Sequence, residues 1–211
     1  GADLSKLHDL TAGCIVGEIP AAKAATPDWT PPEDVLVIIP HCWFPVTAAA
    51  SKAQEDEIPL YGWQDDGWLD MPNTPSMNPA EPVKQFVKWR KAGFNIKKVG
   101  HDRKFARPYV SAMKKAQFSV VDQPQLAVVK SEGFRYIEHK AKVGCLYYCH
   151  AEPFLYCVGN VKATKDDEIV IYEKVEDNKR IDVFDAAVFA TIRFCIDTEK
   201  VTNAAAWFGE E

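Results

Sequence analysis

The sequence predicts a mixed α/β fold, with one central sheet flanked by helices. Strand-like segments come first, helix and strand then alternate, and an apolar helix closes the chain. With 211 residues and 47% hydrophobic content, the chain can bury one sizeable core. It contains neither G-x-G-x-x-G nor G-x-x-x-x-G-K-[ST]. A Rossmann or P-loop nucleotide site is therefore not expected.

The first half of the chain favours strands. Residues 1–5 and 10–19 read as two adjacent strands joined by a turn, where Asp9 is expected to cap the local backbone. Residues 35–44 are apolar and β-branched, which is typical of a buried strand. The other segments expected here are a Pro- and Ala-rich loop over 21–34, a short helix over 48–57, and an irregular stretch with five prolines over 59–82.

The second half alternates between helix and strand. Apolar residues at Val83, Phe86, Val87 and Trp89 have helical spacing, and Gly93 is expected to end that helix. The elements expected after it are a strand over 94–100, a helix over 105–117, a strand over 118–121, a helix over most of 123–142, a hairpin pairing 161–163 with 168–175, and an apolar helix over 180–198.

Apolar runs and cysteines indicate the environment in which the protein works. No apolar run approaches the ~20 residues needed to span a bilayer, and no signal-peptide pattern opens the chain, so a soluble intracellular domain is expected. Because a central strand needs about five residues, the first strand is expected to begin upstream of Gly1, in a longer protein. Six cysteines without framework spacing are expected to be reduced and buried; the alternative is zinc at Cys145, Cys149, His150 and Cys157.

Charge is distributed unevenly along the chain, whose net charge is −5. Residues 1–83 hold thirteen acidic and three basic side chains, whereas residues 84–115 hold eleven basic side chains and one acidic one, Asp102. We predict that three bases beside Asp102 contact nucleic-acid phosphates, with a solvated face as the alternative: Arg103, Lys104 and Arg107. For Lys84, Lys88 and Lys91 a solvated helix face is the expectation.

Three aspartates occupy positions suited to metal chemistry. Asp3 falls on the first strand, Asp102 at the end of a later strand, and Asp182 in the first turn of the last helix. Carboxylate oxygens are the ligands that Mg²⁺ and Mn²⁺ prefer, and two such ions ~4 Å apart can promote phosphodiester cleavage. The pattern alone is unspecific, because the chain has thirty acidic residues and an aspartate at a helix start also stabilises the helix dipole.

Eight different short motifs follow one another along nearly the whole chain. They are Gly1-Ala2-Asp3-Leu4-Ser5, Asp9-Leu10-Thr11-Ala12, Trp43-Phe44-Pro45, Ile58-Pro59-Leu60, Gly67-Trp68-Leu69, Val99-Gly100-His101-Asp102, Gly159-Asn160-Val161 and Lys179-Arg180-Ile181-Asp182. Each motif is unspecific alone. Together, in this order and spacing, they resemble the nuclease domain of tailed-bacteriophage terminase large subunits.

The resemblance implies a ribonuclease H-like fold and an endonuclease that cuts concatemeric double-stranded viral DNA during genome packaging. Asp3, Asp102 and Asp182 would be its catalytic residues and the ligands of two Mg²⁺ or Mn²⁺ ions. The implied partners are double-stranded DNA, an ATPase motor domain upstream in the same full-length chain, the portal protein and the small terminase subunit. The implied location is the cytoplasm of the infected host cell.

Two departures from the family pattern leave alternatives open. The segment Pro72–Ser76 stands where the family often has Thr-Pro-Gly, and Asp185 lies one helical turn beyond Asp182. Either aspartate could be the third ligand, and the Lys-x-Asp pattern favours Asp182. One rival function is another ribonuclease H-like enzyme of the resolvase or transposase type. The other is a catalytically weak domain that docks to the portal and DNA.

Overall fold

The computed structural model describes residues 1–5, 10–55, 57–103, 106–166 and 169–198. A seven-stranded mixed sheet in the order β4-β3-β2-β1-β5-β6 forms its centre, with β7 also paired to β3. Its strands are β1 (Ala2–Asp3), β2 (Thr11–Ile19), β3 (Val35–Trp43), β4 (Leu69–Asp70), β5 (Val99–His101), β6 (Val120–Asp122) and β7 (Leu146–Tyr147). A separate hairpin joins β8 (Val161–Asp166) to β9 (Ile169–Lys174).

The sheet is antiparallel on one side of β1 and parallel on the other. The strand β2 pairs with both β1 and β3 in antiparallel fashion, and nine consecutive residue pairs join β2 to β3. The pairs β1/β5 and β5/β6 are parallel. The carboxyl ends of these three parallel strands therefore meet at one edge of the sheet, where loops carry functional side chains in many α/β folds.

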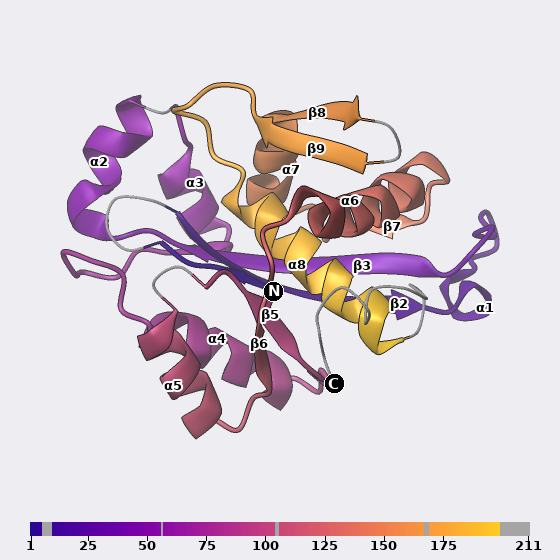
Figure 1. Ribbon diagram of the computed structural model, residues 1–211, viewed down its shortest axis with the longest axis horizontal. Coiled ribbons are helices and arrows are strands. Elements are labelled where there is room, and N and C mark those ends of the chain that lie inside the picture. The colour runs from indigo at the N-terminus through magenta and orange to yellow at the C-terminus, as the bar shows by residue number, and fades with distance from the viewer. Residues whose placement is uncertain (6–9, 56, 104–105, 167–168, 199–211) are drawn as a thin grey trace.

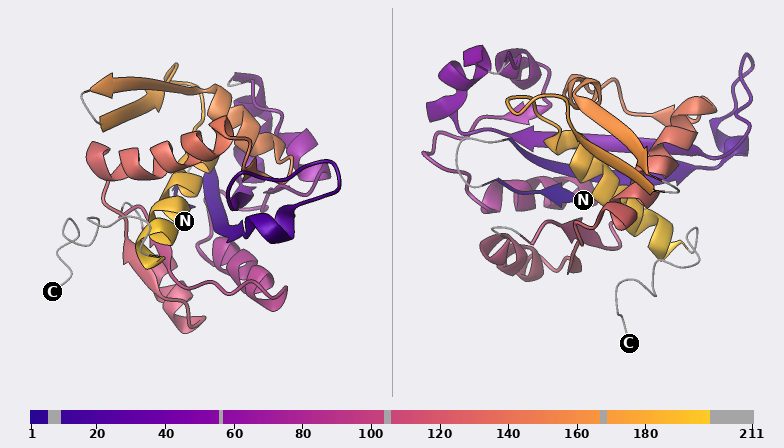
Figure 2. Two further views of the ribbon diagram at one scale, coloured as in Figure 1. Left: turned by 90° about the vertical axis from the view of Figure 1, so that its right-hand side faces the viewer. Right: turned by 45° about the horizontal axis from the view of Figure 1, so that its top comes forward.

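Helices cover both faces of the sheet (Figures 1 and 2). In Figure 1, α6, α7 and the hairpin lie above the sheet and α4 and α5 below it, while α8 crosses the sheet beside β1. The helices are α1 (Ala21–Ala24), α2 (Val46–Glu55), α3 (Leu60–Asp65), α4 (Ala80–Lys91), α5 (Arg107–Lys115), α6 (Ala127–Lys142), α7 (Glu152–Gly159) and α8 (Asp182–Asp197).

Two hydrophobic clusters hold these layers together. The larger one packs β2 and β3 against α6, α7 and α8, with Leu36, Ile38 and Val188 fully buried. The smaller one packs α4 and α5 beneath the sheet around Phe86 and Met113. Twelve of the sixteen residues of α8 are buried, which explains the nearly continuous apolar sequence that predicts this helix.

Most of the predicted elements are confirmed, and the corrections concern short ones. The expected strand over 94–100 is confined to Val99–His101. The stretch 59–82, expected to be irregular, contains α3, β4 and the start of α4, while α1 interrupts the expected loop over 21–34. Helix α3 forms directly after Pro59 and buries Leu60 and Trp63, so core packing stabilises a six-residue helix that has no side-chain cap.

Candidate metal centre

Two of the predicted aspartates point to the same face of the sheet. Ala2 of β1 pairs with His101 of β5 in the parallel ladder, and the Asp102 N–H donates to the Ala2 carbonyl oxygen at 3.3 Å. Successive side chains alternate between the two faces of a sheet. Because Ala2 and His101 are partners, the next residues, Asp3 and Asp102, share the opposite face.

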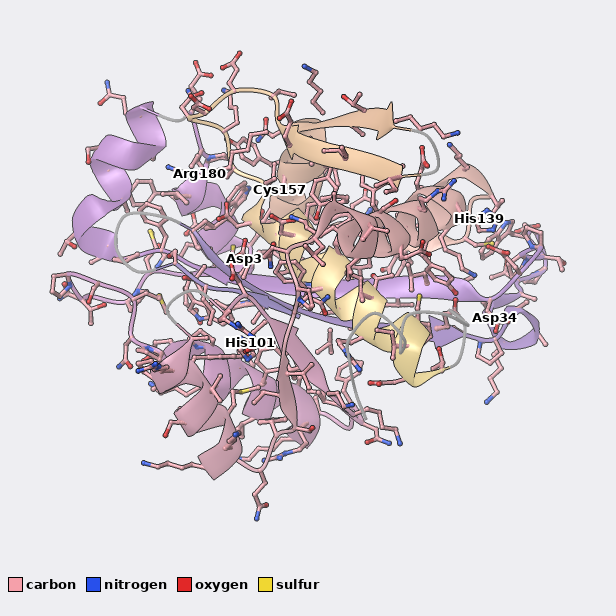
Figure 3. All side chains as sticks on the ribbon, viewed as in Figure 1. Asp3, Asp34, His101, His139, Cys157 and Arg180 are labelled. Carbon is pink, nitrogen blue, oxygen red and sulfur yellow. The ribbon has the colours of Figure 1, made fainter. Side chains whose placement is uncertain are left out.

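Helix α8 brings the third aspartate to that face. It begins at Asp182 and contacts β1, β2 and β5. The chain just before the helix is fixed because the Asn160 side chain donates from Nδ2 to the Arg180 carbonyl oxygen at 3.1 Å. The positive end of the α8 dipole therefore lies beside the carboxylates and stabilises their negative charge. Figure 3 shows Asp3 beside the start of α8.

Three neighbouring carboxylates act on the buried side chain of Asp3. Burial raises the pKa of Asp3 well above 3.8, and the negative charges of Asp182, Asp185 and Asp102 raise it further, while the charge of Lys130 acts in the opposite direction. Like charges disfavour ionisation only when they are close to one another. Asp3, Asp102, Asp182 and the alternative ligand Asp185 are thus linked by their charges, and these four residues are called the aspartate cluster below.

Asp185 is paired with a lysine and a tyrosine. The Nζ atom of Lys130, on α6, lies 2.7 Å from Asp185 Oδ1, and the Tyr172 hydroxyl of β9 donates to the same oxygen. The pKa of Tyr172 is raised by burial and then by Asp185, which keeps this hydroxyl protonated and able to donate. Neither Lys130 nor Tyr172 can be singled out from the sequence, because their contact with Asp185 joins three distant elements.

The side chains beside Asp102 form a second polar group. The buried His101 ring donates from Nδ1 to the Asp102 carbonyl oxygen at 2.9 Å, and its Nε2 lies 3.4 Å from Asp122 Oδ1. The Arg103 guanidinium donates from Nε to Asp122 Oδ2 at 2.9 Å. Arg103 is thus exposed but paired with a carboxylate. Asp122 ends β6, one strand away from Asp102.

The predicted phosphate contacts lie around the same loop. Arg107 is exposed at the start of α5, whereas Lys104, like Asp9, lies outside the described residues. Lys84, Lys88 and Lys91 are exposed on α4, and Lys84 pairs with Glu81 at 2.7 Å, so the predicted solvated helix face is confirmed. The role of Arg103, Lys104 and Arg107 in DNA binding stays a prediction.

The donor chemistry of the aspartate cluster suits Mg²⁺ or Mn²⁺, which take carboxylate oxygens and retain several waters. Among the side chains that the structure describes, no three His, Cys, Asp or Glu stand arranged to hold a metal ion together. Carboxylates without a cation between them repel one another, so closer approach is expected on metal binding. By donor type and placement, Asp3, Asp102 and Asp182 are the residues that would hold such ions.

The cysteines are not members of the aspartate cluster, although Cys42 and Cys157 are near enough to Asp182 for its charge to act on them. All six are free thiols, five of them buried and Cys149 half-buried, as the sequence predicts. Burial, followed by the negative charge of Asp182, raises the pKa of Cys157. Cys145 is also buried, and its thiol donates to the Glu33 carbonyl oxygen at 3.5 Å. In the described parts of the chain, the alternative zinc group around Cys145, Cys149, His150 and Cys157 is not assembled.

An apolar groove of about 790 Å³ lies elsewhere, along the β2 residues that follow Cys14. It is lined by residues 94–99, by the end of α8 and by four residues of β2, namely Ile15, Val16, Gly17 and Ile19. It contains none of the four clustered aspartates. Among the described residues, no helix is long and apolar enough to cross a membrane.

Comparison with known proteins gives one informative likeness. No family model and no curated protein matches the sequence. A crystal structure of the HK97 bacteriophage large terminase matches with a TM-score of 0.75 over 91% of this chain, at 19% sequence identity. The two proteins share a fold. The match spans 38% of the HK97 terminase chain.

This likeness to the HK97 large terminase confirms the expected ribonuclease H-like architecture. The mixed seven-stranded sheet flanked by helices is the part of this chain that the comparison supports most directly. At 19% identity the shared fold does not carry activity with it. Function therefore has to be argued from the aspartate cluster.

Proposed function

We propose that this chain is a Mg²⁺- or Mn²⁺-dependent endonuclease that cuts double-stranded viral DNA during genome packaging. The observation that carries the proposal is the gathering of Asp3, Asp102 and Asp182 on the α8 side of a ribonuclease H-like sheet. Their neighbouring charges make this site strongly negative, and divalent cations would relieve the mutual repulsion. The likeness to the HK97 bacteriophage large terminase supports the same function.

Each aspartate reaches the site from a rigid element. Asp3 and Asp102 are fixed by the β1/β5 ladder, and Asp182 by the first turn of α8. Two metal ions held by these carboxylates would supply an activated water and stabilise the leaving oxygen of the cleaved phosphodiester. The protein residues would orient the ions, while Arg103, Lys104 and Arg107 would hold the DNA backbone alongside.

The test is plasmid cleavage in Mn²⁺ by the wild type and by Asp102→Asn, which keeps the size of the side chain and removes its charge. We expect cleavage to be abolished and the melting temperature to be preserved, because Asp102 lies at a strand end outside both hydrophobic clusters. Asp66→Asn is the matched control, since Asp66 is exposed at the end of α3. Undiminished cleavage by Asp102→Asn would contradict the proposal.

One observation favours the rival docking function, namely that no ready-made metal group is present among the described side chains. A docking domain would bind DNA without cutting it and would show no Mn²⁺ binding that depends on the aspartates. A resolvase-type enzyme would instead prefer branched DNA over linear duplex. Cleavage of plasmid, linear and branched substrates by the same preparation separates the three functions.

The wider partners follow from the same proposal. The chain spans 38% of the HK97 large terminase, so we propose that an ATPase motor domain precedes this domain in a full-length terminase. The portal protein, the small terminase subunit and double-stranded DNA would be its partners in the cytoplasm of the infected host. Co-purification of the full-length protein with a portal ring tests the contact with the portal protein.

A further inference from the structure

We propose that Lys130 is a positioning residue that withholds Asp185 from the metal-binding set, so that metal ions rest on Asp3, Asp102 and Asp182. This inference rests on the proposed metal-dependent function and deepens it. It assigns a role to a lysine on α6 and resolves the choice between Asp182 and Asp185 as third ligand.

The carboxylate of Asp185 already has an ion-pair partner and a hydrogen-bond donor. Its Oδ1 atom lies 2.7 Å from Lys130 Nζ and also accepts a hydrogen bond from the Tyr172 hydroxyl. The side chains of Lys130 and Asp185 are 16% and 14% exposed, so water screens this ion pair poorly. Separating an ion pair that is largely shielded from water leaves an uncompensated charge, which is unfavourable.

Aromatic rings hold the ammonium group in place. Lys130 Nζ lies 4.4 Å from the centre of the Tyr172 ring and 5.7 Å from that of Phe189, distances at which a ring face attracts a cation. Both Asp185 and the two rings therefore attract the lysine. A cation approaching Asp185 would meet a fixed positive charge as well as an occupied oxygen.

Lys130 also balances the charge of the site before metal binds. Its Nζ atom lies 2.7 Å from Asp185, which is one helical turn beyond Asp182, so its charge stands next to the proposed metal ligands. A resident positive charge lets the carboxylates gather without a metal, and it weakens metal binding by repulsion. Removing it should release Asp185 and strengthen metal binding at the same time.

Calorimetric titration with Mn²⁺ in the absence of DNA tests this arrangement. In the wild-type background, Asp182→Asn should abolish binding, whereas Asp185→Asn should raise the Kd only about tenfold, because it removes a neighbouring charge but no ligand. Lys130→Met should lower the Kd about tenfold, because it removes a repelling unit charge beside the site and releases Asp185. Lys130→Arg should restore the wild-type Kd.

The double variant Lys130→Met/Asp185→Asn completes the cycle. It should lose the gain shown by Lys130→Met, because only a released Asp185 can add to the metal set. Equal loss of binding in Asp185→Asn and Asp182→Asn would overturn the inference. So would an unchanged or weaker Kd in a folded Lys130→Met.

Failure of the role of Lys130 is distinguishable from failure of the proposed function. If Lys130→Met does not fold, the comparison of Asp185→Asn with Asp182→Asn decides the question alone. If the wild type binds no Mn²⁺, the proposed function itself fails. If the wild type binds Mn²⁺ and only the Lys130 variants behave otherwise than expected, the function stands and the role of Lys130 falls.

Discussion

Ala2 pairs with His101 between β1 and β5, and this register directs the carboxylates of Asp3 and Asp102 to one face of the sheet. A slip of one residue in either strand would send one of the two carboxylates to the opposite face, towards α4 and α5. The electrostatics of the site therefore depend on a short parallel ladder.

Asp3 should make the metal-free protein sensitive to pH. Its pKa lies well above 3.8 because of burial and then the charges of Asp182, Asp185 and Asp102. A carboxyl group with a raised folded-state pKa stabilises the fold fully below its unfolded pKa, and this contribution is lost as the pH rises through the folded value. Without metal, Asp3→Asn should therefore melt at the same temperature as the wild type near pH 4 and at a higher temperature at pH 7.5.

The measurement is the difference in melting temperature between Asp3→Asn and the wild type across pH, with and without Mn²⁺. Mn²⁺ should stabilise the wild type at pH 7.5 and leave Asp3→Asn unchanged, because the ion replaces the proton in neutralising the site. A constant difference across pH would show that Asp3 is not under electrostatic strain. Asp66→Asn replaces an exposed aspartate, so its melting temperature should equal that of the wild type at every pH.

Gly133 should tolerate no side chain, although it lies inside helix α6. A Cβ atom there would stand 2.7 Å from Ile192 Cγ1 and 2.8 Å from the Val188 carbonyl oxygen, both on α8. Replacing a helical glycine by alanine normally stabilises by about 0.5–1 kcal/mol, but overpacking costs about 1–3 kcal/mol. Gly133→Ala should therefore lower the free energy of unfolding.

Gly62 provides the matched control for Gly133. It lies in helix α3, and a Cβ atom there would meet nothing within 4 Å. Gly62→Ala should raise the free energy of unfolding by about 0.5–1 kcal/mol. Urea denaturation of both variants measures the two effects, and stabilisation by Gly133→Ala would show that α6 and α8 pack less closely than described.

Lys140 should contribute far more to stability than its neighbour Lys142. Its Nζ lies 3.2 Å from Glu18 Oε1 and 3.1 Å from Glu33 Oε1, and the lysine and Glu18 side chains are only 5% and 7% exposed. Removing one partner of a buried ion pair typically costs about 3–5 kcal/mol. Lys140→Met should lower the free energy of unfolding by an amount of this order.

Lys142→Met tests whether burial is the cause of that difference. Lys142 pairs with Glu138 at 2.8 Å, and its side chain is 70% exposed. Exposed pairs contribute about 0–1 kcal/mol, so this variant should unfold almost as the wild type does. The two lysines share one helix and one substitution, so equal effects would contradict the role assigned to burial.

The long elements are predictable because their signal is local. Apolar periodicity over ten or more residues predicts α4, α6 and α8, and the continuous apolar run at 35–44 predicts β3. The two-residue strands β4 and β7 have no such signal, since they exist only through pairing with β3. The helix α7 lies in an aromatic stretch whose composition suits several structures.

The candidate site also has residues with a local sequence signal and residues without one. Asp3, Asp102 and Asp182 stand in short motifs, so they can be singled out from the sequence. Lys130 cannot, because its contact with Asp185 joins α6 to α8 across 55 positions and a helical lysine ordinarily faces water. The pairing of Arg103 with Asp122 escapes prediction for the same reason, and it concerns a residue predicted to bind DNA.

Lys104 and Arg107, which follow Asp102 in the sequence, should make DNA binding depend on salt. Removing one phosphate contact lowers the slope of log K against log salt by roughly 0.9 for duplex DNA. If Lys104 and Arg107 both bind phosphates, their double replacement by Ala should lower the slope by about 1.8. Arg103→Ala should have a smaller effect, because Asp122 already offsets the guanidinium charge at 2.9 Å.

The matched control removes two charges from the exposed lysines of α4, with Lys88→Ala and Lys91→Ala combined. It changes the net charge equally, so a general electrostatic effect would alter both double variants alike. We expect the α4 variant to keep the wild-type slope and cleavage rate, and the Lys104/Arg107 variant to cut more slowly at moderate salt, with the deficit shrinking as salt is lowered. Identical behaviour of the two double variants across a salt series would show that DNA approaches the aspartates from another side.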